Sequence, residues 1–217
     1  MLGLKQGILQ AFEMTSGFSK YDRIETTQSI YCYPDTDVLK NKAGITDSKT
    51  LTQYEADVTA MRQYMLEKNP IKGRFGITHL RNIHKHIFQD VYPFAGKLRL
   101  EDIWKEDTFF CKSQFLEPNL KSLLAKLAAE NHLRKLGLEV FIKRAAYYMS
   151  ELNMIHPFRE GNGRTIREFI RCMALDNGFD IDWSRIDGQE LLKAMIIAVD
   201  NSLEPLEKCL YKVIVNE

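Results

Sequence analysis

Apolar residues recur every three or four positions along most of this chain, which is the spacing that places them on one face of an α-helix. The pattern appears once near the N-terminus and repeatedly after residue 50. Gly178 directly follows one of these stretches, as a left-handed cap at the C-terminal end of a helix would. We predict helices over residues 4–14, 51–67, 76–91, 120–132, 140–155, 164–177, 189–201 and 205–215.

Two segments depart from helical spacing. Residues 98–111 contain two short β-prone runs on either side of the charged Lys105-Glu106-Asp107, which predicts a β-hairpin. Residues 29–47 carry proline, aspartate and glycine turn signals, and we expect an extended entry, a short helix and a turn there. The chain shows no repeat, low-complexity tract or linker, so the expected fold is mainly α, a helical bundle with one β-hairpin in a single domain.

Charge and hydropathy argue against two broad classes of partner. The 217 residues include 30 basic and 29 acidic ones, a formal net charge of +1, so no global field attracts the protein to nucleic acid or membrane. Nucleic acid binding would need a local patch. No run approaches the ~18 apolar residues of a membrane span, and the first residues lack a secretory pattern, so we expect a cytoplasmic protein with no direct nucleic acid or membrane partner.

The cysteines and histidines favour structural roles. The four cysteines show no paired spacing typical of zinc or redox sites, and we expect buried free thiols. His79, His84 and His86 lie on the predicted helix 76–91 but do not share one face. Exposed or capping roles are therefore favoured over a metal site.

One run, HPFREGNGRTIR at residues 156–167, combines several groups suited to phosphate chemistry. Gly161-Asn162-Gly163 falls between a helix predicted to end near residue 155 and another beginning near 164. Backbone N–H groups at a helix N-terminus can form an anion-binding nest, although an ordinary turn has the same composition. Arg164 and Arg167 follow at helical spacing, where they can reach phosphates or form a solvated basic face.

Two further side chains of this run suit catalysis. Glu160 offers a carboxylate to a Mg²⁺ ion that bridges phosphates, or else forms an exposed carboxylate or a salt bridge. His156 precedes Pro157 at the end of the helix, where a neutral imidazole can take a proton from an attacking hydroxyl. A helix cap or a buried structural histidine is the alternative for His156.

The run resembles the motif of the Fic family, His-x-Phe-x-Asp/Glu-Gly-Asn-Gly-Arg-x-x-Arg, and matches it at each specified position. A chance match has a probability on the order of 10⁻⁸ at average residue frequencies. The order of helices, hairpin and motif over about residues 50–215 is similar to the Fic fold. Residues 29–47 resemble the entry segment of stand-alone bacterial Fic toxins, so we expect one Fic domain over residues 1–217, with residues 1–49 packed on the core.

The resemblance implies a protein adenylyltransferase, which transfers AMP from ATP to a Ser, Thr or Tyr hydroxyl of a target protein and releases pyrophosphate. His156 is the implied general base and Glu160 the implied Mg²⁺ ligand. The implied ATP phosphate-binding residues are Gly161, Asn162, Gly163, Arg164 and Arg167, with the Asn162 side chain at the α-phosphate and both arginines at the β- and γ-phosphates.

The family also implies a flap and an adenine pocket. The hairpin corresponds to the flap that pairs with an extended target segment, and Ile103 and Lys105 are the candidates for clamping the acceptor side chain. Asn201 stands where many relatives place a Tyr or Asn of the adenine pocket.

Many Fic proteins carry an inhibitory helix with the pattern Ser/Thr-x-x-x-Glu-Gly/Asn, and we find no such pattern here. The chain therefore resembles the class inhibited by a separate small antitoxin, which would contact Arg167. Toxins of this type modify type II topoisomerase subunits, so these are the first candidate targets by analogy. The alternatives are transfer of UMP, a phosphoryl group or phosphocholine, and a non-catalytic ATP-binding module.

Overall fold

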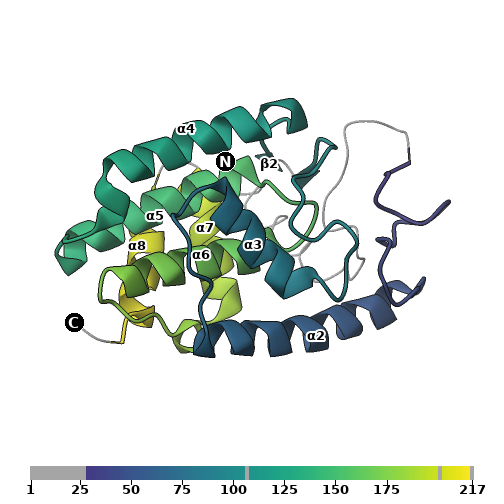
Figure 1. Ribbon diagram of the computed structural model, residues 1–217, viewed down its shortest axis with the longest axis horizontal. Coiled ribbons are helices and arrows are strands. Elements are labelled where there is room, and N and C mark those ends of the chain that lie inside the picture. Colours follow the sequence, from purple (N-terminus) through teal and green to yellow (C-terminus); the bar gives the residue numbers. More distant parts are fainter. Residues whose placement is uncertain (1–27, 106–107, 200–201, 216–217) are drawn as a thin grey trace, which may run out of the picture.

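The computed structural model describes residues 28–105, 108–199 and 202–215. The predicted mainly helical architecture is confirmed, with one short hairpin (Figure 1). The predicted helix over residues 4–14 lies outside the described residues. The helices are α2 Ser48–Lys68, α3 Ile77–Phe88, α4 Leu116–Ala129, α5 Leu138–Ile155, α6 Asn162–Asp176, α7 Gly188–Val199 and α8 Glu204–Val213, and the short 3-10 turns are Ser113–Phe115, Asn131–Leu133 and Trp183–Arg185.

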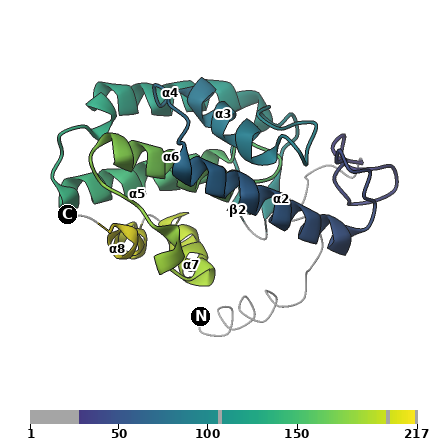
Figure 2. The same cartoon turned by 60° about the horizontal axis from the view of Figure 1, so that its bottom comes forward.

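Helices α5 and α6 form the centre of the bundle. Helix α3 packs against α6 and α4 packs against α5, while α7 and α8 contact α5 from the other side (Figure 2). The buried apolar residues form one cluster that extends from Cys32 to Ile214. Leu152 of α5 and Phe169 of α6 are fully buried within it. Their burial holds together the two helices that flank the 156–161 segment.

The predicted hairpin is present but short. Strand β1 covers Trp104–Lys105 and β2 covers Thr108–Phe109. They pair antiparallel, with Trp104 opposite Phe109 and Lys105 opposite Thr108. The remaining residues of the 98–111 segment lie outside the two strands.

The described part of the entry segment differs from the expectation of a short helix. Residues 28–47 form turns around an isolated bridge between Cys32 and Leu39. Two bonds tie this segment to Glu101, because its carboxylate accepts from the Ser29 hydroxyl at 2.7 Å and from the Ile30 N–H at 2.6 Å. Local turn and bridge bonds, together with these contacts to Glu101, therefore satisfy its polar groups in place of helical hydrogen bonds.

Helix α4 ends earlier than its apolar spacing predicts. It stops at Ala129, and Asn131, His132 and Leu133 follow with φ values of 53°, 54° and 62°. This left-handed turn is held from another helix, since the Asn177 side chain donates to the His132 carbonyl at 3.2 Å. The predicted end at residue 132 is therefore wrong because a tertiary contact overrides the local pattern.

The four cysteines lie largely in the interior, in agreement with the predicted free thiols. The cysteines are all free, three of them buried and Cys111 half-buried. Among the helices formed by the described residues, none has the length and apolar character needed to cross a bilayer.

Candidate active site

His156 occupies the turn that ends α5. Its backbone adopts the left-handed conformation, φ 48° and ψ 62°, and its N–H donates to the Leu152 carbonyl at 3.0 Å. The imidazole is 5% exposed and stacks on the Phe110 ring at a centroid distance of 3.9 Å. Burial lowers the pKa of His156 to about 4, so the ring is neutral near pH 7. Its Nδ1 lies 2.9 Å from the Asn153 carbonyl, which only accepts, so Nδ1 carries the proton and Nε2 has the lone pair.

A buried arginine holds the backbone of this turn. Arg99 is 1% exposed, and its Nε donates to the His156 carbonyl at 2.8 Å. Its Nη1 donates to the Glu101 carbonyl at 2.6 Å, and its Nη2 donates to the Cys111 carbonyl. Its backbone N–H donates to the Pro157 carbonyl at 2.9 Å. The Arg99 side chain thus links the His156 turn to both ends of the hairpin segment.

The Asn162 side chain fixes the loop from within. It is fully buried, its Oδ1 accepts from the Phe158 N–H at 2.9 Å and its Nδ2 donates to the Phe158 carbonyl at 2.7 Å. The Phe158 ring stacks on His84 at 3.9 Å. His84 donates from Nε2 to the Glu160 carbonyl at 2.9 Å and accepts at Nδ1 from the Gly96 N–H at 2.8 Å. The loop is therefore closed by two buried polar side chains.

The expectation that the histidines of α3 are exposed or capping is wrong for two of them. His84 is fully buried in the loop contacts described above, and burial lowers its pKa to about 4. His79 is 3% exposed, and its Nε2 contacts the Ile71 carbonyl at 2.8 Å. Both are structural histidines, and within the described ranges no group of three or more His, Cys, Asp or Glu residues could hold a metal ion.

The Gly-Asn-Gly segment begins α6 rather than forming a loop before it. Gly161 is the N-cap with φ 80°, and a Cβ there would lie 2.1 Å from Cζ of Phe88. Gly161 has no side chain that could cap this helix, so the N–H groups of the first turn are available to an anion. Gly163 is exposed, and a Cβ there would meet nothing nearer than Arg167 Nη1 at 3.9 Å. Internal packing therefore requires glycine at 161 but not at 163.

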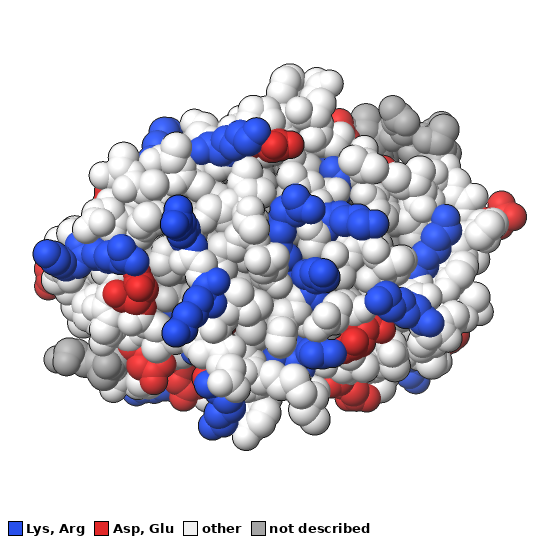
Figure 3. All heavy atoms as spheres, in the orientation of Figure 1, with Lys and Arg blue, Asp and Glu red and all other residues white. Residues whose placement is uncertain are grey.

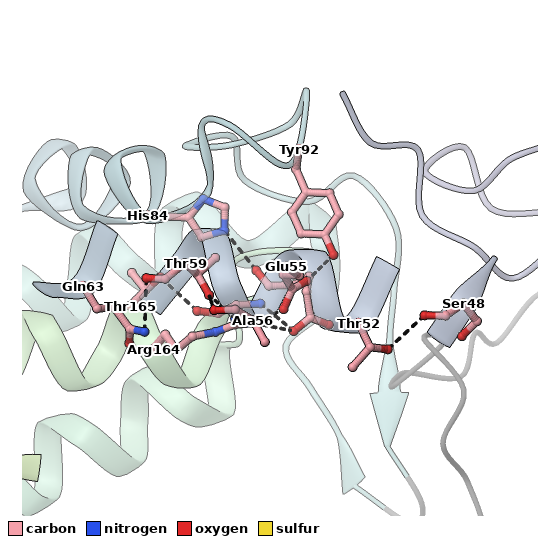
Figure 4. A network of polar contacts seen from close by, with 12 residues as sticks. Ser48, Thr52, Glu55, Ala56, Thr59, Gln63, His84, Tyr92, Arg164 and Thr165 are labelled. Carbon is pink, nitrogen blue, oxygen red and sulfur yellow. Dashed lines mark hydrogen bonds and ion pairs between the residues drawn. The ribbon is translucent and has the colours of Figure 1, made fainter. Parts of the chain in front are cut away.

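Arg164 is committed to contacts inside the protein (Figure 4). Its Nη2 lies 2.5 Å from Oε1 of Glu55 on α2 and 3.5 Å from Oε1 of Glu160, and its Nη1 donates to the Thr59 hydroxyl at 3.0 Å. The guanidinium also lies 4.6 Å from the centre of the Phe88 ring. Arg164 thereby fastens the start of α6 to α2.

Arg167 is half-buried and has a different environment. No described residue forms a hydrogen bond or ion pair with its guanidinium in this structure. Burial and the repulsion of Arg164 lower the pKa of Arg167. A partly desolvated cation beside a second cation, with no carboxylate partner, is a site suited to an anion.

The functional side chains meet in a cavity of about 220 Å³, the His156 cavity. Its polar wall contains His156, Arg167, Gly163 and, from the hairpin, Lys105 and Thr108. Its apolar wall comes from α5, α6 and α7 and contains Met149, Ile166, Leu191, Leu192, Met195 and Ile196. An apolar slot beside a cation and a helix N-terminus suits a ligand with one flat apolar part and one anionic part.

The other predicted site residues lie elsewhere. Arg164 lines an adjoining cavity of about 600 Å³, which shares Arg167 with the His156 cavity. Gly161 and Asn162 are buried at the start of α6, and Ile103 is 1% exposed and does not line the His156 cavity. Of the two predicted clamp residues, only Lys105 therefore faces the cavity. Asn201 lies outside the described residues.

Glu160 presents a single buried carboxylate, 3% exposed. Its Oε1 accepts from the Gly161 N–H at 2.9 Å and lies 3.5 Å from Arg164. Mg²⁺ commonly takes one or two protein carboxylates and completes its shell with phosphate oxygens and water. Glu160 lines neither the His156 cavity nor the adjoining one, and its carboxylate shares Arg164 with that of Glu55. It could supply one such ligand, and it would not suffice for an all-protein metal site.

Comparison with known proteins agrees with this geometry. The family model of the Fic/DOC family matches residues 74–174. The probable protein adenylyltransferase y4lH of Sinorhizobium fredii is 36% identical over 189 residues, which cover 85% of this chain and 95% of the relative. The chain belongs to the Fic/DOC family.

A second relative and a solved structure are also similar to this Fic chain. The protein adenylyltransferase VbhT of Bartonella schoenbuchensis is 42% identical over 174 residues, covering 80% of this chain but only 36% of VbhT, so the chain spans about a third of that protein. The N-terminal Fic domain of a VirB-translocated Bep effector from Bartonella quintana, solved with bound ADP, has a TM-score of 0.80 and 28% identity. Their superposition covers 86% of this chain and 95% of that one.

Sequence reasoning missed the residues that support the Fic loop. Arg99 stands between two leucines in a β-prone run, and a lone charge in such a run was the available signal. Glu55 and Thr59 lie four positions apart on the buried side of α2, four and eight positions after the buried Leu51. Polar residues at these positions indicate a buried polar partner, which is Arg164 on α6.

Removing Glu55 tests the buried pair. We expect Glu55→Ala to reduce the free energy of unfolding by about 3 kcal/mol, because it leaves the Arg164 charge largely buried without its main partner. Urea unfolding monitored by circular dichroism measures this loss. The matched control is Glu117→Ala, whose pair with Lys121 is exposed and screened by water, so its loss should be much smaller. Equal losses in the two variants would contradict the assigned role of Glu55.

Proposed function

We propose that this Fic chain is a protein adenylyltransferase that transfers AMP from ATP to a Ser, Thr or Tyr hydroxyl of a target protein and releases pyrophosphate. The observation that carries the proposal is one cavity containing a neutral histidine, an arginine that has no ion-pair partner among the described residues, and the open start of a helix. The names of the relatives, protein adenylyltransferase and probable protein adenylyltransferase, support the same activity.

His156 is the proposed general base. Its Nδ1 proton is directed to the Asn153 carbonyl, so Nε2 is the atom that takes the proton of the acceptor hydroxyl. The depressed pKa keeps the ring unprotonated at neutral pH and ready to accept. The hydroxyl oxygen then attacks the α-phosphorus, and the bond from that phosphorus to the pyrophosphate oxygen breaks.

The phosphates of ATP are proposed to lie between Arg167 and the first turn of α6. Arg167 supplies a guanidinium that can bind the terminal phosphates bidentately, and the α6 N–H groups supply dipoles directed at the α-phosphate. Gly163 leaves room for the phosphate chain against the backbone. Arg164 does not line the His156 cavity, so its charge acts on the phosphates only at longer range. A direct phosphate contact would require Arg164 to break its ion pair with Glu55.

Glu160 is the proposed Mg²⁺ ligand, with phosphate oxygens and water completing the shell. A bound Mg²⁺ would neutralise charge on the phosphates as pyrophosphate leaves. Asn162 contributes by holding the loop through Phe158, whether or not its amide also reaches the α-phosphate.

The target is proposed to lie along the hairpin, where an extended segment could pair with the edge of the two-stranded sheet. Lys105 and Thr108 line the cavity beside His156 and can register the acceptor side chain. Ile103 supports the hairpin from the core. The apolar wall from α5 to α7 is the proposed adenine slot. The resemblance also implies Asn201 for this pocket, and that residue lies outside the described residues.

Replacing His156 tests the chemistry. We expect His156→Ala to lower the rate of AMP transfer by ~10²–10⁴-fold, because the acceptor hydroxyl loses its base. The measurement incubates purified protein with ATP labelled at the α-phosphate, Mg²⁺ and bacterial lysate, and follows label on protein bands. Arg134→Ala, at a surface pair with Asp176, is the control and should retain the wild-type rate. Wild-type labelling by the His156→Ala variant would exclude this mechanism.

We further propose a toxin held inactive by a separate small antitoxin that contacts Arg167 in the cytoplasm of a bacterium. Arg167 has no carboxylate partner among the described residues, so a glutamate from a second chain could occupy the same place as the terminal phosphate. The type II topoisomerase subunits are the first candidate targets by family analogy.

Expression in bacteria tests the toxin proposal. Wild-type protein expressed alone should arrest growth, and His156→Ala should be tolerated at the same expression level. Co-expression of a small helical protein encoded next to it should restore growth. Normal growth with active, folded enzyme present in the cells would contradict the proposal.

A further inference from the structure

Basic side chains gather on the face of the molecule formed by α3. Figure 3 shows Lys and Arg across the middle of this face, with Asp and Glu mainly toward its margins. Two adjoining cavities, of about 510 Å³ and 620 Å³, hollow the surface along α3 and share Thr78 and Asn82. We call these two cavities together the basic groove.

The basic groove concentrates positive charge. None of the described residues that line it is an aspartate or glutamate. Lys121 is paired with Glu117 at 2.7 Å, and the other basic residues of its walls are exposed and form no ion pair with a described residue. These unpaired cations are Lys42, Lys72, Arg74, Arg81, Lys85 and Lys97. On a chain of net charge +1, this is the local patch that binding to a polyanion would require.

We propose that the basic groove binds the phosphate backbone of a nucleic acid duplex. Successive phosphates along a duplex match a row of separate cations, and neutralising them releases condensed counterions. The first turn of α3 adds to this row, because its cap Gly76 makes no side-chain cap bond and Gly76, Ile77 and Thr78 line the groove.

The composition of the groove favours nucleic acid over a protein partner. Protein interfaces are built around exposed aromatic and aliphatic residues, whereas nucleic acid interfaces are polar and positively charged. No exposed large hydrophobic residue of the described chain lies in the groove, and its uncharged exposed positions include Thr78 and Asn82.

A duplex is favoured over a single strand for a related reason. Proteins that bind single strands stack the bases on exposed aromatic rings. The aromatic residues of the groove, Phe75 and Tyr92, are 4% and 1% exposed and belong to the core. The groove therefore offers phosphate contacts without a stacking surface, and we expect binding that is independent of sequence.

The basic groove and the His156 cavity lie on different sides of the bundle. Helix α3 packs on α6, while α7, which walls the His156 cavity, packs on the other side of α5 (Figures 1 and 2). A duplex in the groove would thus leave the His156 cavity open to ATP and target. The proposal does not depend on the adenylyltransferase activity.

The test measures binding of the full chain to a labelled 20-base-pair DNA duplex by fluorescence anisotropy from 50 to 200 mM salt. With about five phosphate contacts, the slope of log K against log salt should be about −4 to −5. In the variant Lys42→Gln/Lys85→Gln/Lys97→Gln, the magnitude of this slope should fall by about 3, and binding should weaken on the order of 100-fold at 100 mM salt. The matched control Lys49→Gln/Lys143→Gln/Lys193→Gln removes the same charge from exposed positions outside the groove and should bind as the wild type does.

Further ligands separate the alternatives. An RNA duplex of the same length bound with a similar slope would support backbone recognition, and so would binding to DNA alone. Equal binding by the two triple variants, or tighter binding of a single strand than of the duplex, would overturn the proposal. Preference for a poly-glutamate peptide or for anionic lipid vesicles over the duplex would also overturn it. Far-ultraviolet circular dichroism of each variant verifies that a loss of binding is not a loss of fold.

Discussion

The backbone turn that carries the His156 imidazole is held by the guanidinium of Arg99. This group is 1% exposed, yet it donates to the carbonyls of His156, Glu101 and Cys111. Burial lowers its pKa to about 10, which still leaves it charged at neutral pH, and carbonyl dipoles replace its hydration. The His156 turn has a left-handed backbone that costs free energy on its own. Arg99 compensates this cost and connects the turn to the hairpin that is proposed to present the target.

Two arginines three positions apart on α6 have separate tasks. Arg164 faces Glu55 and Glu160 and fixes the helix, while Arg167 faces the cavity and forms no hydrogen bond or ion pair with a described residue. Burial and the repulsion of Arg164 lower the pKa of Arg167, and an anion bound at Arg167 would offset the repulsion. One arginine of the motif thus stabilises the start of α6, and the other is available to the phosphates of the proposed substrate.

Periodicity and a dense motif made most of the fold and the centre of the site predictable. The stretches between 140 and 177 carry apolar residues at helical spacing, and this spacing alone indicates both helices, although α6 is buried on all sides from Glu168 to Ala174. Tertiary contacts decided the rest. Helix α4 stops early because Asn177 holds a left-handed turn, and α2 buries Glu55 while Met61 remains 59% exposed. The basic groove was hidden for another reason, since its cations come from separate segments of a chain whose net charge is near zero.

The position of the transferred phosphorus tests the central claim most directly. Purified protein is incubated with Mg²⁺ and bacterial lysate, once with ATP labelled at the α-phosphate and once with ATP labelled at the γ-phosphate. An AMP transfer directed by His156 and Arg167 predicts labelled protein with the α-label only. Label from the γ-phosphate alone would show phosphorylation and contradict the proposed activity, and no label from either, beside a working control enzyme, would contradict catalysis on proteins of that lysate.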